Sequence, residues 1–559
     1  MKLRKLLLFS FICFSGIAYS QNKKTSALPR PKLVVGLVVD QMRWDYLYRY
    51  YERYSNKGFK RLLNEGFSCE NTYIPYIPTY TAIGHSTIYT GSIPAIHGIA
   101  GNDWLEQNNG RMEYCTEDTT VKAVGSTSKA GRMSPRNLWA TTITDELKLA
   151  TNFRSKVIGI ALKDRGGILP VGHSANAAYW YDDLTGNWIT STYYMSDLPQ
   201  WVKAFNEQRL VDKYLTQKWN TQYPIESYKQ SSEDNSPRYE GKFKNEKGPI
   251  FPHDIAVNRT SDWSIIRNTP FANTLTFDFA KASIENEALG QDEVTDFLAV
   301  SLSSTDYLGH QFGPNSIEIE DTYLRLDNDL AAFLEHLDKT VGKGQYTIFL
   351  SADHGAAHNP IFLKDNKIPA GLWSGASGLK ADISEINNIL AKKYNTDKIV
   401  RRLFNYQVNF NYPLIEEKNL NLEEIKKDVI AYYKKQAGVS YVIDLKNIGI
   451  QPLPDALKSR TINGYNEKRS GEVQIILNPG WYQGSGNQAT GTTHGTWNPY
   501  DTHIPLLFMG WGIKQGKSNQ EYFMTDIAST IAALLRIQEP NGNVGKPIAE
   551  VIKLSLGSD

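Results

Sequence analysis

Apolar runs that lie far apart in this chain each end close to an aspartate. The runs and the aspartates that follow them are Lys32–Val39 with Asp40, Phe297–Leu302 with Asp306, and Gln345–Leu350 with Asp353. Short apolar runs of this kind predict buried strands of a parallel sheet. Open α/β sheets bind ligands beyond the carboxyl ends of their strands, so the three carboxylates are expected to meet there. We therefore predict an α/β fold with a largely parallel central sheet and helices on both faces.

Histidines close to these strand ends add a metal-binding pattern. His310 follows Asp306 by four residues, His354 directly follows Asp353, and His494 precedes a further apolar run. Carboxylate and imidazole together suit a transition-metal ion, most simply zinc. Gly309 and Gly313-Pro314 favour turns, so we expect Asp306 and His310 on one short loop. Taken alone, the two residues fit a solvated pair on such a loop equally well. Their recurrence at several strand ends favours ligands, with Asp306, His310 and His494 on one metal and Asp40, Asp353 and His354 on a second.

The segment Tyr73–Gly91 predicts a helix that begins beside a threonine. Pro78 excludes a helix before it, whereas Ala82–Tyr89 can form one. Thr81 would then lie at the helix N-terminus, where free N–H groups and the dipole favour a negative oxygen or a phosphate. On local grounds alone, an N-cap role for Thr79 or Thr81 is the stronger alternative.

Several motifs in combination resemble those of the alkaline phosphatase superfamily. They are Pro78-Thr79-Tyr80-Thr81, the HGIAGN turn at 97–102, DYLGHQFGP at 306–314, ADHG at 352–355 and the Thr-His-Gly at 493–495. The segment Leu162-Lys163-Asp164-Arg165-Gly166 and the residues after it resemble, more narrowly, the phosphate-irrepressible PafA-type alkaline phosphatases of Gram-negative bacteria. The resemblance covers most of the chain after residue 20.

The resemblance implies an alkaline phosphatase-like fold, a role for each matching residue and a reaction. Thr81 is implied as the nucleophile and as a metal ligand, and Asn102, Lys163 and Arg165 as phosphate contacts. All six expected ligands match, which implies two zinc ions. The implied reaction is hydrolysis of phosphate monoesters through a phosphothreonine. As an unassigned pair, Lys163 and Arg165 would be solvated charges, but the expected strand Lys156–Ala161 brings both to the same sheet edge.

Other functions share parts of this pattern. A phosphodiesterase or nucleotide pyrophosphatase of the same superfamily would keep the six ligands and the threonine. Two extra cations, Lys163 and Arg165, favour a dianionic monoester over a diester. An arylsulfatase would need a Cys or Ser in a C/S-x-P-x-R context, which the sequence lacks. A non-catalytic phosphate- or metal-binding module would not need an intact nucleophile.

The N-terminus predicts export. Met1–Ser20 carries basic residues, an apolar run and a small-polar end, which is typical of a secretory signal peptide. Its removal takes three positive charges from a net charge of +2 and leaves about −1, which gives no case for nucleic-acid or membrane-surface binding. We expect a periplasmic or secreted monomer without a membrane anchor that acts on small phosphate monoesters. In an oxidising compartment Cys69 and Cys115 could pair or stay free.

The strand ends that must meet are spread from residue 40 to residue 494, which favours one large domain over several. We predict a signal peptide at 1–20 and a single catalytic domain at 21–559, with insertions at about 166–290 and 376–490. Ala178–Tyr194 predicts a β-hairpin. Among the remaining histidines, His358 and His503 are expected to support the ligands because they are close to them in the sequence.

Overall fold

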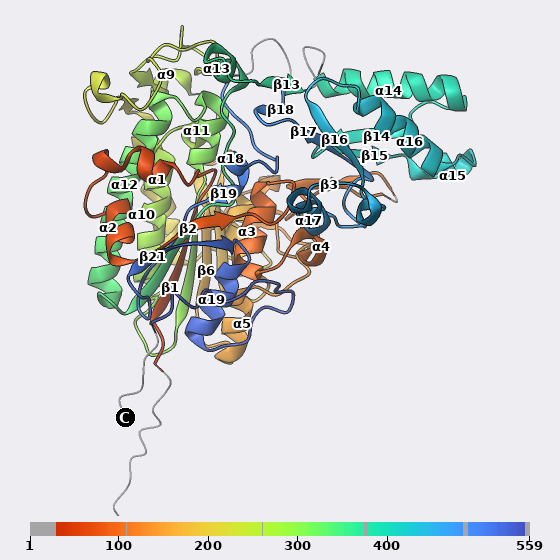
Figure 1. Ribbon diagram of the computed structural model, residues 1–559. Helices are drawn as coiled ribbons and strands as arrows, with labels where there is room; N and C mark the ends of the chain where they lie inside the picture. Colours follow the sequence, from red (N-terminus) through yellow and green to blue (C-terminus); the bar gives the residue numbers. More distant parts are fainter. Residues whose placement is uncertain (1–28, 108, 260, 374–377, 485–489, 554–559) are drawn as a thin grey trace, which may run out of the picture.

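The computed structural model describes residues 29–553 except 108, 260, 374–377 and 485–489. A twisted central sheet forms the middle of the main body (Figure 1). Among these residues, the middle of the sheet is a run of parallel strands in the order β12, β1, β11, β6, β7. In that order their bounds are Tyr346–Ser351, Leu33–Val39, Asp296–Leu302, Val157–Ala161 and Ala177–Asp182. The predicted largely parallel α/β sheet is confirmed.

Antiparallel strands flank this parallel run. β20 pairs with β12 on one side, and β8 pairs with β7 on the other, so β7 and β8 form the predicted hairpin. The outer strands are β2, β19 and β21 beyond β20, and β5 beyond β8. The bounds are Leu506–Gly510 for β20, Asn187–Ser191 for β8, Phe67–Tyr73 for β2, His503–Ile504 for β19, Gly516–Phe523 for β21 and Ala123–Val124 for β5.

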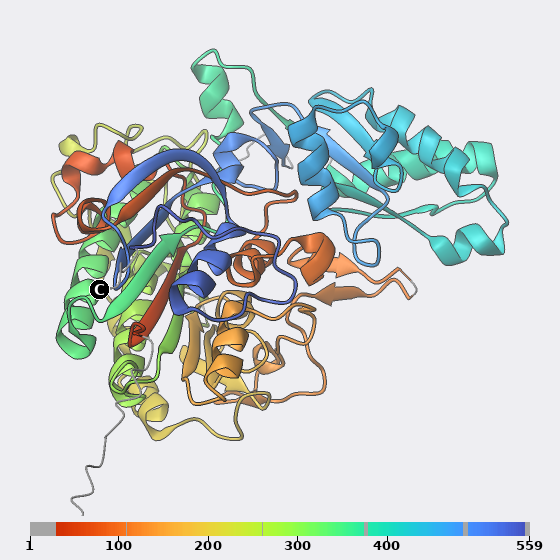
Figure 2. The ribbon, with the colours of Figure 1, turned by 60° about the horizontal axis from the view of Figure 1, so that its bottom comes forward.

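Helices cover both faces of the sheet (Figure 2). On one face lie α10 and α12, and on the other α3, α5 and α19. Their bounds are Phe271–Asn286, Ile317–Leu337, Thr81–Thr90, Ile143–Ala150 and Asp526–Leu535. The parallel strands are buried along their whole length because helices close them from both sides.

The segment with Asp306 and His310 is a helix, which corrects the expected loop. α11 runs over Ser304–Phe312, so Gly309, expected in a turn, lies inside it, and the helix ends before Gly313 at φ 83°. Residues four apart lie on the same side of a helix, so α11 presents Asp306 and His310 together. Helical geometry therefore holds this pair more rigidly than a loop would.

α3 begins at Thr81, as predicted, and ends before Gly91, which takes the left-handed conformation at φ 60°. The helix lies very close to the end of β12. A Cβ atom at Gly84 would come within 2.4 Å of the backbone oxygen of Asp353. Glycine is therefore required at this position, because it lets the N-terminal turn of α3 approach the sheet edge.

A smaller unit lies beside the main body in Figure 1 and falls within the span 376–490. Its antiparallel sheet has the order β14, β15, β17, β16, with bounds Val400–Phe404, Gln407–Phe410, Val473–Leu477 and Val439–Asp444. Helices α14 (Gly378–Tyr394) and α16 (Leu422–Tyr433) pack on this sheet, and residues of the sheet and both helices share an apolar core. We call this unit the inserted unit. By contrast, β7 and β8 lie within the span 166–290 but belong to the main sheet, so that span is not wholly an insertion.

Cys69 and Cys115 are buried and unpaired, so the disulfide left open above does not form. The predicted signal peptide at 1–20 lies outside the described residues. Over the described ranges, no helix is both long enough and apolar enough to span a membrane.

Candidate active site

The predicted ligands come together at the carboxyl edge of the parallel strands. Asp40 directly follows β1, Asp353 and His354 follow β12, and Asp306 lies in α11 after β11. His494 comes from the loop that precedes α18 (Pro499–Thr502). Adjacent parallel strands end at the same edge, which is why residues so distant in the sequence meet here.

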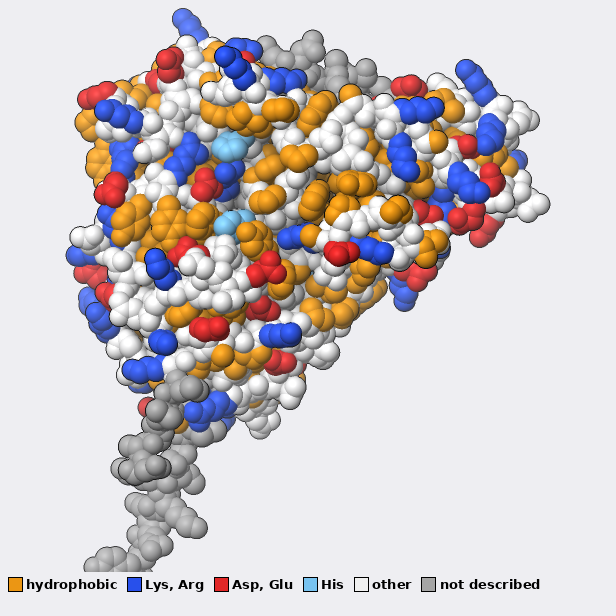
Figure 3. Space-filling view, in the orientation of Figure 1, with side chains coloured by type: hydrophobic (Ala, Val, Ile, Leu, Met, Phe, Trp, Pro, Cys, Tyr) orange, Lys and Arg blue, Asp and Glu red, His pale blue; other side chains and the backbone are white. Residues whose placement is uncertain are grey.

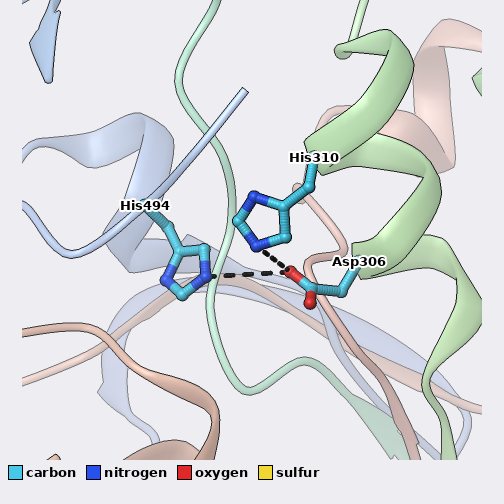
Figure 4. Close-up of side chains that lie close together, drawn as sticks. All are labelled: Asp306, His310 and His494. Carbon is cyan, nitrogen blue, oxygen red and sulfur yellow. Dashed lines mark ion pairs between the residues drawn. The ribbon is translucent and has the colours of Figure 1, made fainter. Parts of the chain in front are cut away.

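Asp306, His310 and His494 form the first cluster (Figure 4). The Oδ1 atom of Asp306 lies 3.1 Å from His310 Nε2 and 3.7 Å from His494 Nε2. Each ring is oriented through its other nitrogen: His310 Nδ1 lies 2.8 Å from the Thr492 carbonyl and His494 Nδ1 lies 2.6 Å from the Thr79 carbonyl. A carbonyl partner makes Nδ1 the protonated nitrogen, so Nε2 is the nitrogen that can bind a metal.

In the second predicted set, His354 lies close to both Asp40 and Asp353. His354 Nε2 lies 3.4 Å from Asp353 Oδ2 and 3.6 Å from Asp40 Oδ1. Both of these carboxylate oxygens are buried and make no hydrogen bond within the described residues. Ligand atoms of Asp40, Asp306 and His354 also lie within 4.8 Å of one another, so Asp306 is within reach of both clusters. Buried oxygens that lack donors and face an imidazole nitrogen fit a divalent cation.

The charges of the site are unequal. Burial and the negative charge of Asp40 raise the pKa of the Asp353 carboxyl well above its ordinary value. Burial alone would also raise the pKa of Asp306, but His310 and Lys163 beside it hold that pKa well below its usual range. A cluster of buried carboxylates with so little compensating charge suits bound cations.

Lys163 lies between two of these carboxylates. Its Nζ is 2.6 Å from Asp40 Oδ2 and 2.5 Å from Asp306 Oδ2. Burial lowers the lysine pKa, but Asp306 and Asp40 together raise it above its ordinary value, so the ammonium keeps its charge. Lys163 was expected as a phosphate contact, and in this structure its partners are the two carboxylates.

The positions of Thr81 and Thr79 separate the two candidate nucleophiles. Thr81 Oγ1 lies 3.5 Å from His354 Nε2, at the first residue of α3. The Thr79 hydroxyl, in contrast, donates to the Thr496 carbonyl at 3.1 Å and accepts the Gly495 N–H at 3.0 Å. Thr79 therefore has a structural role in the loop that carries His494, whereas Thr81 faces the predicted metal ligands.

The two remaining predicted residues are held by neighbours. Asn102 Oδ1 accepts the Ala82 N–H at 2.9 Å, one of the free donors at the start of α3. Arg165 Nη1 donates to the Tyr114 hydroxyl at 2.9 Å, and that hydroxyl donates to Asp164 Oδ1 at 2.9 Å. Arg165 Nε is buried without a partner among the described residues. No sequence pattern predicted Tyr114 at this site, because it lies in another segment.

Gln41 and His85 are two further residues of the site that were not predicted from the sequence. The Gln41 side chain donates to Asp306 Oδ1 at 2.6 Å, and its backbone N–H donates to Asp353 Oδ1 at 3.1 Å. Its φ of 64° is uncommon for a residue other than glycine. Its position directly after Asp40 was the one feature of the sequence that pointed to a place in the site. His85 Nδ1 lies 2.9 Å from the Thr81 carbonyl, and its Nε2 lies 2.8 Å from Ser301 Oγ.

His358 and His503, expected to support the ligands, have partners elsewhere. His358 Nδ1 lies 2.7 Å from Asn315 Oδ1, and His503 Nε2 lies 2.8 Å from the Glu70 carbonyl. Histidine side chains reach the surface on the face seen in Figure 3.

The first cluster is open to small molecules, because the side chain of His310 is 38% exposed.

Comparisons with known proteins cover the whole site. A family described as type I phosphodiesterase / nucleotide pyrophosphatase matches residues 34–501, which include every predicted ligand. A Myroides odoratus protein named calcium-transporting ATPase is 57% identical and matches over 99% of this chain and 100% of its own length. Alkaline phosphatase PafA of Elizabethkingia meningoseptica is 54% identical over 98% of this chain and 99% of its own. A crystal structure of wild-type PafA matches with a TM-score of 0.91 at 54% identity, covering 94% of this chain and 100% of that one.

The first cluster yields a test by metal binding. His310→Ala removes one of three side-chain donors, and His336→Ala, a half-buried histidine on α12, is the matched control. We expect the His310 variant to bind zinc more weakly by at least the roughly 10–100-fold that loss of a supporting residue costs. Zinc content and chelator competition measure the effect. Equal affinity in the wild type and the His310 variant would contradict the ligand assignment.

Proposed function

The chain belongs to the alkaline phosphatase superfamily, and we propose that it is a metal-dependent alkaline phosphatase that hydrolyses phosphate monoesters. The observation that carries this proposal is 54% identity over nearly the full length to alkaline phosphatase PafA, together with the assembly of the predicted residues at one sheet edge. Full-length similarity supports a shared activity more strongly than a shared fold does.

We propose two zinc ions, one on Asp306, His310 and His494 and one on Asp40, Asp353 and His354, with Thr81 as a further ligand. Bound zinc would supply positive charge that favours the ionised form of a nearby hydroxyl and stabilises a departing oxygen. The geometry that supports this assignment is the set of short distances around Asp306 and His354.

Thr81 is the proposed nucleophile. Its hydroxyl oxygen attacks phosphorus and gives up its proton, the ester oxygen leaves on the opposite side and takes up a proton, and a phosphothreonine and an alcohol form. Water then displaces the Thr81 oxygen from phosphorus, which releases phosphate and restores the hydroxyl. The N-terminal N–H groups of α3 lie beside this oxygen and favour the negative charge that the phosphoryl group carries.

Asn102 and Arg165 are the proposed phosphate contacts. The Asn102 amide is held by its oxygen on Ala82, so its NH₂ group is available to a phosphoryl oxygen. Arg165 is fixed through Tyr114 and Asp164, and a guanidinium fixed in this way loses little freedom when it binds. We assign Lys163 to the same role, with Asp40 and Asp306 holding its ammonium between the clusters.

The runner-up is a phosphodiesterase or nucleotide pyrophosphatase, which the description of the matching family names. Such an enzyme would use the same ligands and the same threonine. We also propose export through the predicted signal peptide at 1–20, so that N-terminal sequencing of the exported protein should begin at Gln21.

The nucleophile can be identified by trapping the covalent intermediate. Rapid acid quench after mixing with a labelled monoester should leave phosphate on Thr81, and Thr81→Ala should abolish this label. Thr79→Val keeps the branched side chain, and it should retain the label while losing two hydrogen bonds and some stability. Label on Thr79, or on no residue of the active wild type, would contradict the assignment.

Arg165 discriminates between the two candidate functions. Replacing Lys163 would leave two buried carboxylates unpaired, so Arg165→Ala is the cleaner variant. A charge-assisted hydrogen bond contributes about 1.5–3 kcal/mol, so kcat/KM for an aryl monoester should fall about 10–100-fold. A matched aryl diester has one free charge fewer and should lose much less.

The measurement is kcat/KM for both substrates in the wild type and in Arg165→Ala, with Arg154→Ala as an exposed control at the end of α5. ATP, whose terminal phosphoryl group also carries two charges, is included because of the name of the Myroides relative. If the wild type prefers the diester, or if Arg165→Ala lowers both rates equally, the monoesterase proposal fails.

A further inference from the structure

The inserted unit contacts the main body at the segment that carries Asn102. Helix α17 (Asp455–Gly464) lies against α4 (Pro94–His97), as Figure 1 shows. Residues 98–103 follow α4 directly and include Asn102. We call residues 98–103 the Asn102 segment. Its first and last residues are both hydrogen-bonded by side chains of the inserted unit.

Arg469 holds the start of the Asn102 segment. Its Nη1 donates to the carbonyl of Gly98 and to the carbonyl of Asn137, both at 2.7 Å. Its guanidinium lies 4.4 Å from the ring centre of Trp104 and 4.1 Å from that of Trp139, so two indoles enclose it. Arginine is the side chain that combines stacking on two rings with hydrogen bonds in the guanidinium plane.

Arg469 is buried, with 9% exposed, and its guanidinium forms no ion pair with a carboxylate of the described residues. Burial lowers its pKa to about 10 and outweighs the charges of Glu106 and Glu113, which act to raise that pKa. A buried cation that bonds only to carbonyls and rings is costly for stability alone, so its position calls for a role at the contacts that it makes.

Asn405 holds the end of the Asn102 segment. It lies in the turn between β14 and β15, where its φ is 54°, and its Nδ2 donates to the Asp103 carbonyl at 3.1 Å. A Cβ atom at Gly101 would lie 2.4 Å from Asn405 Nδ2, so the turn and the segment pack without space between them. Asn466, also from the inserted unit, donates to the Pro94 carbonyl at 3.3 Å.

We propose that Arg469 and Asn405 are positioning residues for the reaction: by fixing both ends of the Asn102 segment, the inserted unit holds the Asn102 amide at the N-terminus of α3. This inference rests on the proposed phosphate contact of Asn102. The main body also supports this segment: the Ile99 N–H donates to His97 Nδ1 at 3.1 Å, the Asn102 carbonyl accepts the Cys115 N–H at 2.9 Å, and Asp103 pairs with Tyr114 of a neighbouring strand. Arg469 and Asn405 add the contacts that come from the inserted unit. A displacement of the segment would move the amide away from the phosphoryl oxygen.

The experiment measures competitive inhibition by inorganic phosphate, which the proposed reaction releases as product. Arg469→Gln keeps a polar side chain but removes the cation and the double donor. We expect its inhibition constant for phosphate to rise about five- to tenfold, the effect of one weakened contact. Arg469→Lys can still reach the carbonyls and should recover most of this loss. Arg402→Gln, on an exposed arginine of β14, is the matched control and should change nothing.

Combining Arg469→Gln with Asn102→Ala tests whether Arg469 acts through Asn102. If Arg469 acts through Asn102, Arg469→Gln should raise the inhibition constant for phosphate by less than about twofold in a protein that already carries Asn102→Ala. An equal loss in both backgrounds, or no loss in the first, would overturn the proposal. If Asn102→Ala itself leaves phosphate inhibition unchanged, the proposed phosphate contact fails, and that outcome is distinct from failure of the positioning role.

Asn405→Gly gives an independent arm that does not disturb the buried cation. Glycine tolerates the left-handed backbone of the turn, so only the side-chain contacts are lost. The same rise in the inhibition constant, again absent in the Asn102→Ala background, supports the proposal. Thermal unfolding identifies variants that do not fold, and if Arg469→Gln is one of them, the Asn405 result decides.

Discussion

Burial of three aspartates beside one another is the constraint on which the site depends. Asp40, Asp306 and Asp353 are each at most 4% exposed. An unpaired buried carboxylate costs several kcal/mol, so a few of them would cost about as much as the whole free energy of unfolding of a domain. Lys163 bridges two of the three aspartates, and the backbone N–H of Gln41 bonds the third. The imidazoles of His310, His354 and His494 complete the surroundings. An arrangement so poor in positive charge is explained by the cations that the proposed function requires.

The sheet edge and the start of α3 meet at this site and bring its residues together. Parallel strands deliver the carboxylates to one edge, and the glycine at position 84 lets α3 come close enough for Thr81 to face His354. The same approach brings the free N–H groups of the first helical turn to the place where a phosphoryl group would lie. The proposed anion site and the proposed cation sites thus depend on the same packing contact.

The inserted unit and the main body both support the proposed phosphate contacts. Arg165 is held within the main body by Tyr114 and Asp164, whereas the segment with Asn102 is held at both ends by Arg469 and Asn405. Tyr114, Arg469 and Asn405 come from segments other than the ends of the parallel strands. Electrostatic catalysis requires donors that do not reorganise during the reaction, and rigid outer contacts are the means by which a protein provides them.

The sequence alone determined the parallel sheet, the start of α3 at Thr81 and the identity of the clustered residues, because strand period, helix-start chemistry and strand-end placement are local patterns. It did not determine that Asp306 and His310 share a helix, since glycines at 309 and 313 are typical of turns and only packing against the sheet edge favours α11. The sequence also did not predict the partners of Lys163 or the contacts of Tyr114, Gln41, Arg469 and Asn405. These contacts join segments separated by tens to hundreds of residues, and only the tertiary structure, by fixing distances between such segments, decides which polar groups meet.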